Sequence, residues 1–295
     1  MVHPFSPEGL AAVPPGLEEL RRGADTGEIF QAMCVKCDEF HNLHIDLGNI
    51  RGVIPREETA LGIAEGKVRE IAILSRVGKP ICFQVLGFDK SGAPLLSRRA
   101  AQLEARSYFL SALRPGDIIP ARVQNVTDFG VFCDIGCGFS ALMRIDRCCV
   151  SRLITSGDLF HPGQPICVAV LGADDREGLI HLTGRELLGT WEENAEHYRQ
   201  GQTVTGTVRS VMPYGIFVEL TPNLSGLAES MAGIQVGDGV SVFLRAILPE
   251  KHKIKLNILE KLPSPLPVQP PEYFITSGHI SKWEYYPGSK AVTYF

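Results

Sequence analysis

One pattern occurs twice in this chain: PGDIIPARVQNVTDFGVFCDIG at residues 115–136 and QGQTVTGTVRSVMPYGIFVELTP at residues 200–222. In both copies a glycine precedes a run in which apolar residues alternate with others, and an aromatic–glycine pair precedes a second such run. Alternation with a period of two is typical of half-buried β-strands. Each copy therefore predicts two strands that turn one face toward a core.

The repeat extends beyond these segments and has a third copy. GKPICFQVLGFDKSGAPLLSRR at residues 78–99 matches GQPICVAVLGADDREGLIHLTGR at residues 163–185, with one residue of slippage. The units begin at Gly27, Gly116 and Gly201. Each unit has roughly 60 to 75 residues, which suits a small barrel better than a large domain. Closure into a barrel is favoured because it leaves no exposed strand edges.

The predicted fold class is all-β, with three tandem five-stranded barrels joined by short helices. The predicted parts are an extension (1–26), a degenerate first barrel (27–99), a helical linker (100–115), a second barrel (116–183), a helical linker (184–200), a third barrel (201–262) and a tail (263–295). The tail begins with a proline-rich spacer and then holds seven of the 23 aromatic residues. We expect it to pack on the third barrel or on a partner.

Composition limits the class of protein. The formal net charge is −4, so no global cationic field attracts nucleic acid, and any such binding depends on local features. No stretch approaches the roughly 18 apolar residues of a membrane helix, and the eight cysteines lack the dense spacing of a secreted scaffold. We expect a cytoplasmic protein with reduced thiols and no membrane partner.

Two phenylalanines stand out against the strand pattern. Phe132 and Phe217 fall opposite to the apolar core positions and should face solvent. Phe129 and Tyr214 precede them by three residues, and the intervening Gly130 and Gly215 could bring both rings of each pair to one face. Adjacent exposed rings form a platform on which bases stack. The alternative is that the rings only cover a barrel end or pack against a neighbouring unit.

The two quoted segments resemble the RNA-binding domain of bacterial small-subunit ribosomal protein S-one, a five-stranded barrel of the oligonucleotide-binding (OB) class. The resemblance implies that the three predicted barrels are OB-fold barrels. The resemblance is strong over residues 114–262 and weaker over residues 27–99. It implies a nucleic-acid face built from two aromatics, a histidine on the next strand, and an aspartate and a basic residue near the last hairpin. It also implies that degenerate units of multi-repeat members can dock proteins.

Each unit matches only part of that implied site. The aromatics correspond to Phe129 and Phe132 and to Tyr214 and Phe217, whereas His41 and His44 replace them in the first unit. The histidine position holds Pro55, Arg144 or Glu229, and only Glu229 would repel phosphate. The predicted RNA-binding residues are Phe129, Phe132, Arg144, Asp175, Arg176, His181, Arg209, Tyr214, Phe217, Arg245, Lys253 and Lys255.

Cys34, Cys37, His41 and His44 also allow a zinc interpretation, but their spacing differs from that of common zinc modules, and the cysteines fall on a predicted buried strand. We expect no metal site, cofactor or catalytic residue. The leading hypothesis is a non-enzymatic binder of single-stranded RNA in translation or RNA turnover, with the ribosome as a candidate partner. The alternative is a protein-docking module for a ribosomal or ribonuclease partner. The sequence leaves the oligomeric state open.

Overall fold

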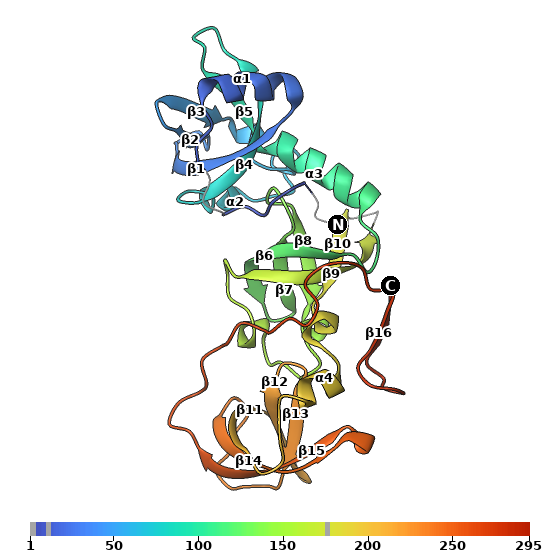
Figure 1. Cartoon of the computed structure of the whole chain (residues 1–295). Helices are drawn as coiled ribbons and strands as arrows, with labels where there is room; N and C mark the ends of the chain where they lie inside the picture. The colour runs from blue at the N-terminus through green and yellow to red at the C-terminus, as the bar shows by residue number, and fades with distance from the viewer. Residues whose placement is uncertain (1–3, 10–12, 175–177) are drawn as a thin grey trace. The chain divides into compact units, whose positions relative to one another are not determined.

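A computed structural model describes residues 4–9, 13–174 and 178–295 of the chain. Within these residues the strands form three closed five-stranded barrels, which confirms the predicted fold class (Figure 1). In each barrel the first three strands are neighbours in chain order, the third pairs with the fifth in parallel, and the fourth closes onto the first. The repeat seen in the sequence is therefore a repeat of one OB-like topology.

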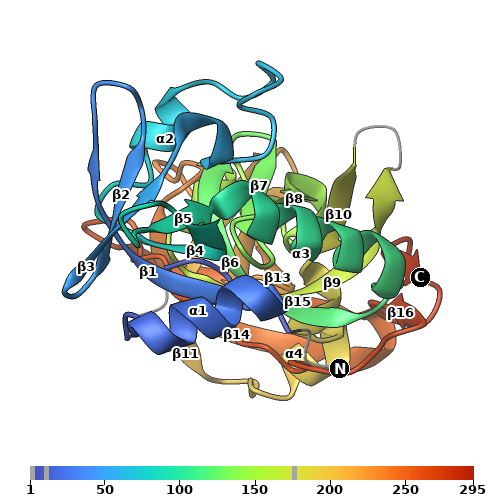
Figure 2. The ribbon, with the colours of Figure 1, turned by 90° about the horizontal axis from the view of Figure 1, so that it is seen from above.

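The first barrel surrounds a core to which helix α1 contributes Leu20. α1 lies against β4 and covers that side of the barrel (Figure 2). Cys34 is also buried in this core, as the strand pattern predicts. The elements are α1 (Leu17–Thr26), β1 (Ile29–Cys37), β2 (Leu43–Leu47), β3 (Ile50–Ile54), η1 (Arg56–Glu58), α2 (Ile71–Leu74), β4 (Pro80–Phe88) and β5 (Pro94–Ser97).

Helix α3 (Arg98–Ala112) follows the first barrel directly. It begins where the Ser97 hydroxyl accepts a hydrogen bond from the Ala100 amide at 2.8 Å, a typical N-cap. Phe109 near its end is buried. Among the residues that the structure describes, no helix is long and apolar enough to cross a lipid bilayer.

The second barrel confirms the predicted alternation. Val131 and Cys133 are fully buried, and Phe132 between them is partly exposed. The elements are β6 (Ile118–Thr127), β7 (Gly130–Asp134), β8 (Ser140–Arg144), η2 (Ile145–Arg147), η3 (Ser156–Asp158), β9 (Pro165–Asp174) and β10 (Leu179–Thr183). The short helices η4 (Arg185–Leu188) and α4 (Trp191–Ala195) lead to the third barrel.

The third barrel repeats this pattern, with Ile216 and Val218 buried on either side of Phe217. Its core also contains Trp191 of α4 and Trp283 of the tail. The elements are β11 (Thr203–Met212), β12 (Gly215–Thr221), β13 (Leu224–Ala228), β14 (Gly239–Leu248), η5 (Pro249–Lys251) and β15 (Lys253–Lys261), followed in the tail by β16 (Lys282–Glu284) and β17 (Val292–Tyr294).

The tail packs on the second barrel as well as on the third, a contact that the sequence did not predict. The Ile280 amide donates to the Gly116 carbonyl at 2.9 Å, and the Ile118 amide donates to the Gly278 carbonyl at 3.1 Å. A Cβ at Gly116 would lie 2.0 Å from the Ile280 carbonyl oxygen, so only glycine permits this approach. At the third barrel, the Tyr285 backbone carbonyl accepts a hydrogen bond from the Trp191 amide at 2.9 Å.

Candidate nucleic-acid interface

Two aromatic pairs occupy equivalent places on the second and third barrels. Phe132 on β7 and Phe217 on β12 point outward, because their neighbours along each strand are buried. Phe129 and Tyr214 lie in the preceding turns and are 57% and 69% exposed. Ring centroids are 6.0 Å apart in the second barrel and 6.2 Å apart in the third, with interplanar angles of 89° and 88°. The same edge-to-face pair therefore recurs on both barrels.

The glycine inside each pair has a packing role that the sequence did not reveal. A Cβ at Gly130 would lie 2.4 Å from the Met143 carbonyl oxygen of β8. A Cβ at Gly215 would lie 2.5 Å from the Ala228 carbonyl oxygen of β13. Any larger residue would push the third strand of the barrel away from the second. The glycines thus hold the next strand beside the aromatic pair.

A row of outward-facing residues crosses the third barrel from strand to strand. Ser210 on β11 pairs with Phe217, Phe217 pairs with Leu227 on β13, and Leu227 pairs with Lys255 on β15. Two strand spacings, about 10 Å, separate Phe217 from Lys255. Lys253 and Lys255 are exposed, and within the described part of the chain neither forms an ion pair. A base stacked on Phe217 would place neighbouring phosphates within reach of this strand.

Arg245 lies beside that row, at the β-bulge of β14 opposite β15. Its Nη1 atom is 3.0 Å from the Glu229 carboxylate, and Glu229 is 82% exposed. Exposed ion pairs contribute little to stability, so Arg245 can exchange this carboxylate for a phosphate at small cost. Glu229 stands at the position that the S-one resemblance implies for histidine. Its carboxylate is therefore already paired with the Arg245 cation.

The second barrel presents Arg144 and His181 on adjacent strands. His181 on β10 pairs in parallel with Leu142 on β8, and Arg144 follows two residues later on the same outward face. The Arg144 side chain is 66% exposed, and its Nε atom donates to the Asp146 carboxylate at 3.0 Å. Asp175 and Arg176, also predicted to bind RNA, lie outside the described residues.

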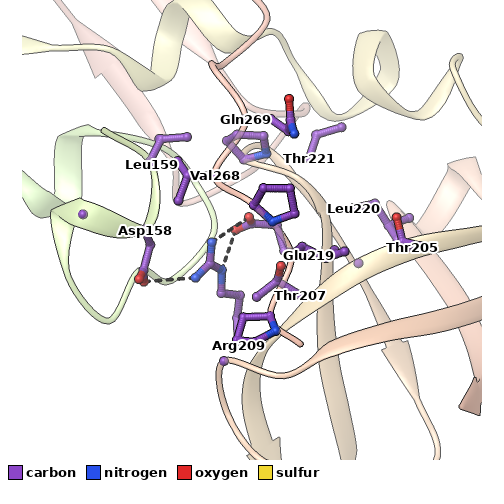
Figure 3. A pocket seen from close by; sticks show the side chains of 17 residues that line it. Asp158, Leu159, Thr205, Thr207, Arg209, Glu219, Leu220, Thr221, Val268 and Gln269 are labelled. Carbon is purple, nitrogen blue, oxygen red and sulfur yellow. Dashed lines mark hydrogen bonds and ion pairs between the residues drawn. The ribbon is translucent and has the colours of Figure 1, made fainter. Parts of the chain in front are cut away.

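Arg209 has a different environment from the one predicted. It is only 9% exposed, and its guanidinium donates to both Glu219 carboxylate oxygens, at 3.0 and 2.9 Å (Figure 3). A third bond, of 3.0 Å, reaches Asp158 of the second barrel. A buried guanidinium needs carboxylate partners to offset the loss of water. Arg209 thus joins two barrels beside a cavity of about 560 Å³, and its donors are not available to phosphate.

No family model matches the chain. It is 28% identical to the small ribosomal subunit protein bS1 homolog of Bacillus subtilis over 249 residues, which is 82% of this chain and 62% of the relative. It is 29% identical over 240 residues to bS1 of Leuconostoc lactis, covering 75% and 54%. It is 30% identical over 200 residues to bS1 of Neisseria meningitidis, covering 61% and 35%. The predicted resemblance to ribosomal protein S-one is confirmed. The chain spans less than two thirds of the length of each of these relatives.

The first barrel departs from the S-one pattern, and the structure shows what replaces the aromatic pair. His44 takes the strand position of Phe217, and its Nε2 atom lies 3.1 Å from the Asp38 carboxylate. The His41 Nδ1 atom lies 3.4 Å from the Glu70 carboxylate. Both rings are thus bound to acidic side chains. This arrangement replaces the edge-to-face aromatic pair with two histidine–carboxylate pairs.

Three residues near Phe217 were not singled out from the sequence. Arg152, His252 and Tyr286 line a cleft that Phe217 also lines. They come from the second barrel, from the turn before β15 and from the tail. Residues so distant along the chain carry no shared spacing, so only the aromatic richness of the tail gave a signal.

Proposed function

We propose that this chain binds single-stranded RNA through the outer faces of its second and third barrels and acts in translation or RNA turnover without catalysing a reaction. The recurrence of one exposed edge-to-face aromatic pair at the same register of two barrels carries this proposal. A ring exposed by chance on one barrel need not recur at the same register of the other.

The chemistry of these faces favours a flexible strand over a duplex. Stacking on an aromatic platform contributes about 1 to 3 kcal/mol per base and requires bases that are unstacked from a partner strand. Exposed basic residues beside the platforms, Arg144 on one barrel and Lys255 on the other, can pair with phosphates. The relatives named as ribosomal proteins make the ribosome the first candidate partner and the cytoplasm the expected compartment.

A titration of the full chain against poly-U, duplex RNA and single-stranded DNA tests the proposal. Poly-U should bind more tightly than the duplex. Phe132→Ala should weaken binding to poly-U by roughly 5- to 150-fold without lowering the melting temperature. The matched control is Val131→Ala, which should lower the melting temperature because Val131 is fully buried, while the folded protein keeps its affinity. If Phe132→Ala unfolds the protein instead, the ring is a packing element.

The non-enzymatic part of the proposal needs its own measurement. Labelled single-stranded RNA incubated with excess protein should keep its length and its end groups. Fragments that appear in proportion to the protein concentration would contradict this part. The same preparation with Phe132→Ala serves as the control, since cleavage by a contaminant would not respond to the substitution.

One observation favours a second candidate function, protein docking by the first barrel. Leu95 of β5 takes the position of Lys255, and Leu86 takes that of Arg245; they are 45% and 57% exposed. Adjacent exposed leucines are typical of protein contacts rather than of RNA contacts. The double variant Leu86→Ser, Leu95→Ser should lower co-sedimentation with ribosomal subunits while affinity for poly-U stays unchanged. A parallel loss of both would contradict a separate docking role.

A further inference from the structure

A cleft of about 310 Å³ opens beside Phe217 on the third barrel. The floor comes from the barrel, where Ser210 and Ser225 present hydroxyl groups from β11 and β13. Its volume lies at the lower end for small-molecule sites, about 300 Å³. The cleft is therefore large enough for one planar group next to the aromatic platform.

One wall of the cleft is an aromatic stack that the tail completes. The His252 and Tyr286 rings are 4.1 Å apart and nearly parallel, at 8°. Trp191 meets the His252 ring edge-on at 5.4 Å, and His252 Nε2 is 2.8 Å from the Glu192 carboxylate. His252 also has a left-handed backbone, with φ of 47°, which is uncommon outside glycine. Several contacts thus fix the ring on which Tyr286 is stacked.

A second part of the lining comes from the second barrel and carries a cation, Arg152. The Val150 amide donates to the Asn223 side chain at 2.9 Å, and the Ser151 amide donates to the Pro222 carbonyl at 3.0 Å. The Ser151 and Ser225 hydroxyl oxygens are also 3.0 Å apart. These bonds anchor the loop to the third barrel. Next in the chain, Arg152 is exposed, and no ion pair holds it within the described ranges.

The charges around the cleft do not oppose an anion at Arg152. Arg209, which lines the cleft, holds the Glu219 carboxylate in an ion pair. The Glu192 carboxylate is directed to His252. Arginine recognises phosphate by paired hydrogen bonds, and aromatic rings recognise bases by stacking. The lining therefore includes the two kinds of group that one nucleotide needs, an aromatic ring and a guanidinium.

We propose that this cleft binds a single nucleotide of the RNA, with its base against Phe217 and Tyr286 and its phosphate on Arg152. The inference rests on the proposed RNA binding and assigns it a further site. Ser210 also lines the cleft, and its hydroxyl group would be available to the base edge or the ribose. The second barrel, the third barrel and the tail each contribute one part, so the site requires all three to be present in one chain.

The experiment measures the affinity of the full chain for a labelled oligo-U at two salt concentrations. Arg152→Ala should weaken binding about fivefold, and Tyr286→Ala by about fivefold or more, whereas Tyr286→Phe should retain affinity. Arg199→Ala and Tyr294→Ala are the matched controls, because both residues are exposed and neither lines the cleft. Melting temperatures are recorded for every variant, since Tyr286 also packs against the barrel core.

The two proposals fail in different ways. If wild-type protein binds oligo-U and Phe217→Ala weakens it, but Arg152→Ala binds like Arg199→Ala, the nucleotide site is refuted and RNA binding stands. If the wild-type protein does not bind oligo-U, both are refuted. A photo-crosslink from 4-thiouridine in the oligonucleotide to the peptide containing Tyr286 supports the site directly. Loss of that crosslink in Arg152→Ala, but not in Arg199→Ala, supports the phosphate contact.

Discussion

The first and third barrels place different side chains on the same strand positions. Where the first strand bulges, the first barrel has Val35 and the third has Arg209. On the second strand, opposite the residue that follows the bulge, His44 stands in the first barrel and Phe217 in the third. The strand order is shared, and so are buried strand positions such as Ile45 and Val218, whereas these two positions differ. One topology thus supports an acidic and apolar face in one unit and an aromatic and basic face in another.

The largest expected contrast concerns stability at the bulge. Arg209→Ala should lower the free energy of unfolding by about 3 kcal/mol, because it leaves the Glu219 and Asp158 carboxylates without their shared partner. Val35→Ala should change it little, since Val35 is 52% exposed. Urea denaturation of both variants measures the difference. Equal midpoints would show that Arg209 is as dispensable as Val35.

The second contrast concerns RNA affinity. Phe217→Ala should weaken binding to oligo-U by roughly 5- to 150-fold, because a stacking surface is lost. His44→Ala should leave affinity unchanged, because the Asp38 carboxylate holds the His44 ring. Fluorescence anisotropy with the full chain measures both. A loss of affinity in His44→Ala would mean that the first barrel also contacts RNA.

A smaller contrast concerns charge at the fifth strand of each barrel. Lys255→Ala should reduce the slope of log affinity against log salt by about 0.7, the value for one phosphate contact on a single strand. Leu95→Ala, at the equivalent position of β5, should leave the slope unchanged. Titrations at four salt concentrations give both slopes. If Lys255→Ala keeps the wild-type slope, Lys255 does not pair with phosphate.

The smallest contrast is in acid. Partial removal from water acts to raise the pKa of Asp38, but hydrogen bonds from Asn42, His44 and the Phe40 amide lower it to about 2. The ordinary pKa is 3.8, so the charged form favours the folded loop above about pH 4, and this contribution is lost as the pH falls toward 2.

The turn at Tyr214 has no equivalent carboxylate and should not respond. Amide signals of Phe40 and Asn42 should therefore shift with a midpoint near pH 2, while that of Tyr214 stays constant. A midpoint near the ordinary aspartate value would show that the loop hydrogen bonds do not form in solution.

Much of the fold was predictable because the repeat and the alternation of apolar residues along each strand are local features of the sequence. Val131 and Val218 identify buried strand positions, and Phe132 and Phe217 identify the outward ones, from alternation alone. The same reasoning placed Arg209 on an outer face but could not name its neighbours. Its partner Asp158 is 51 residues away along the chain. Alternation tells which face a side chain takes, and it carries no information about what the rest of the molecule places there.

The sequence by itself thus determined three units of one barrel topology and the two aromatic pairs, since both follow from spacing within a unit. Only the tertiary structure decided that the tail joins the second and third barrels and that Arg152 and Tyr286 meet beside Phe217. It also decided that Arg209 is held by carboxylates. These outcomes depend on contacts between segments far apart in the chain, whose free energies are set by burial and charge pairing rather than by spacing within a unit.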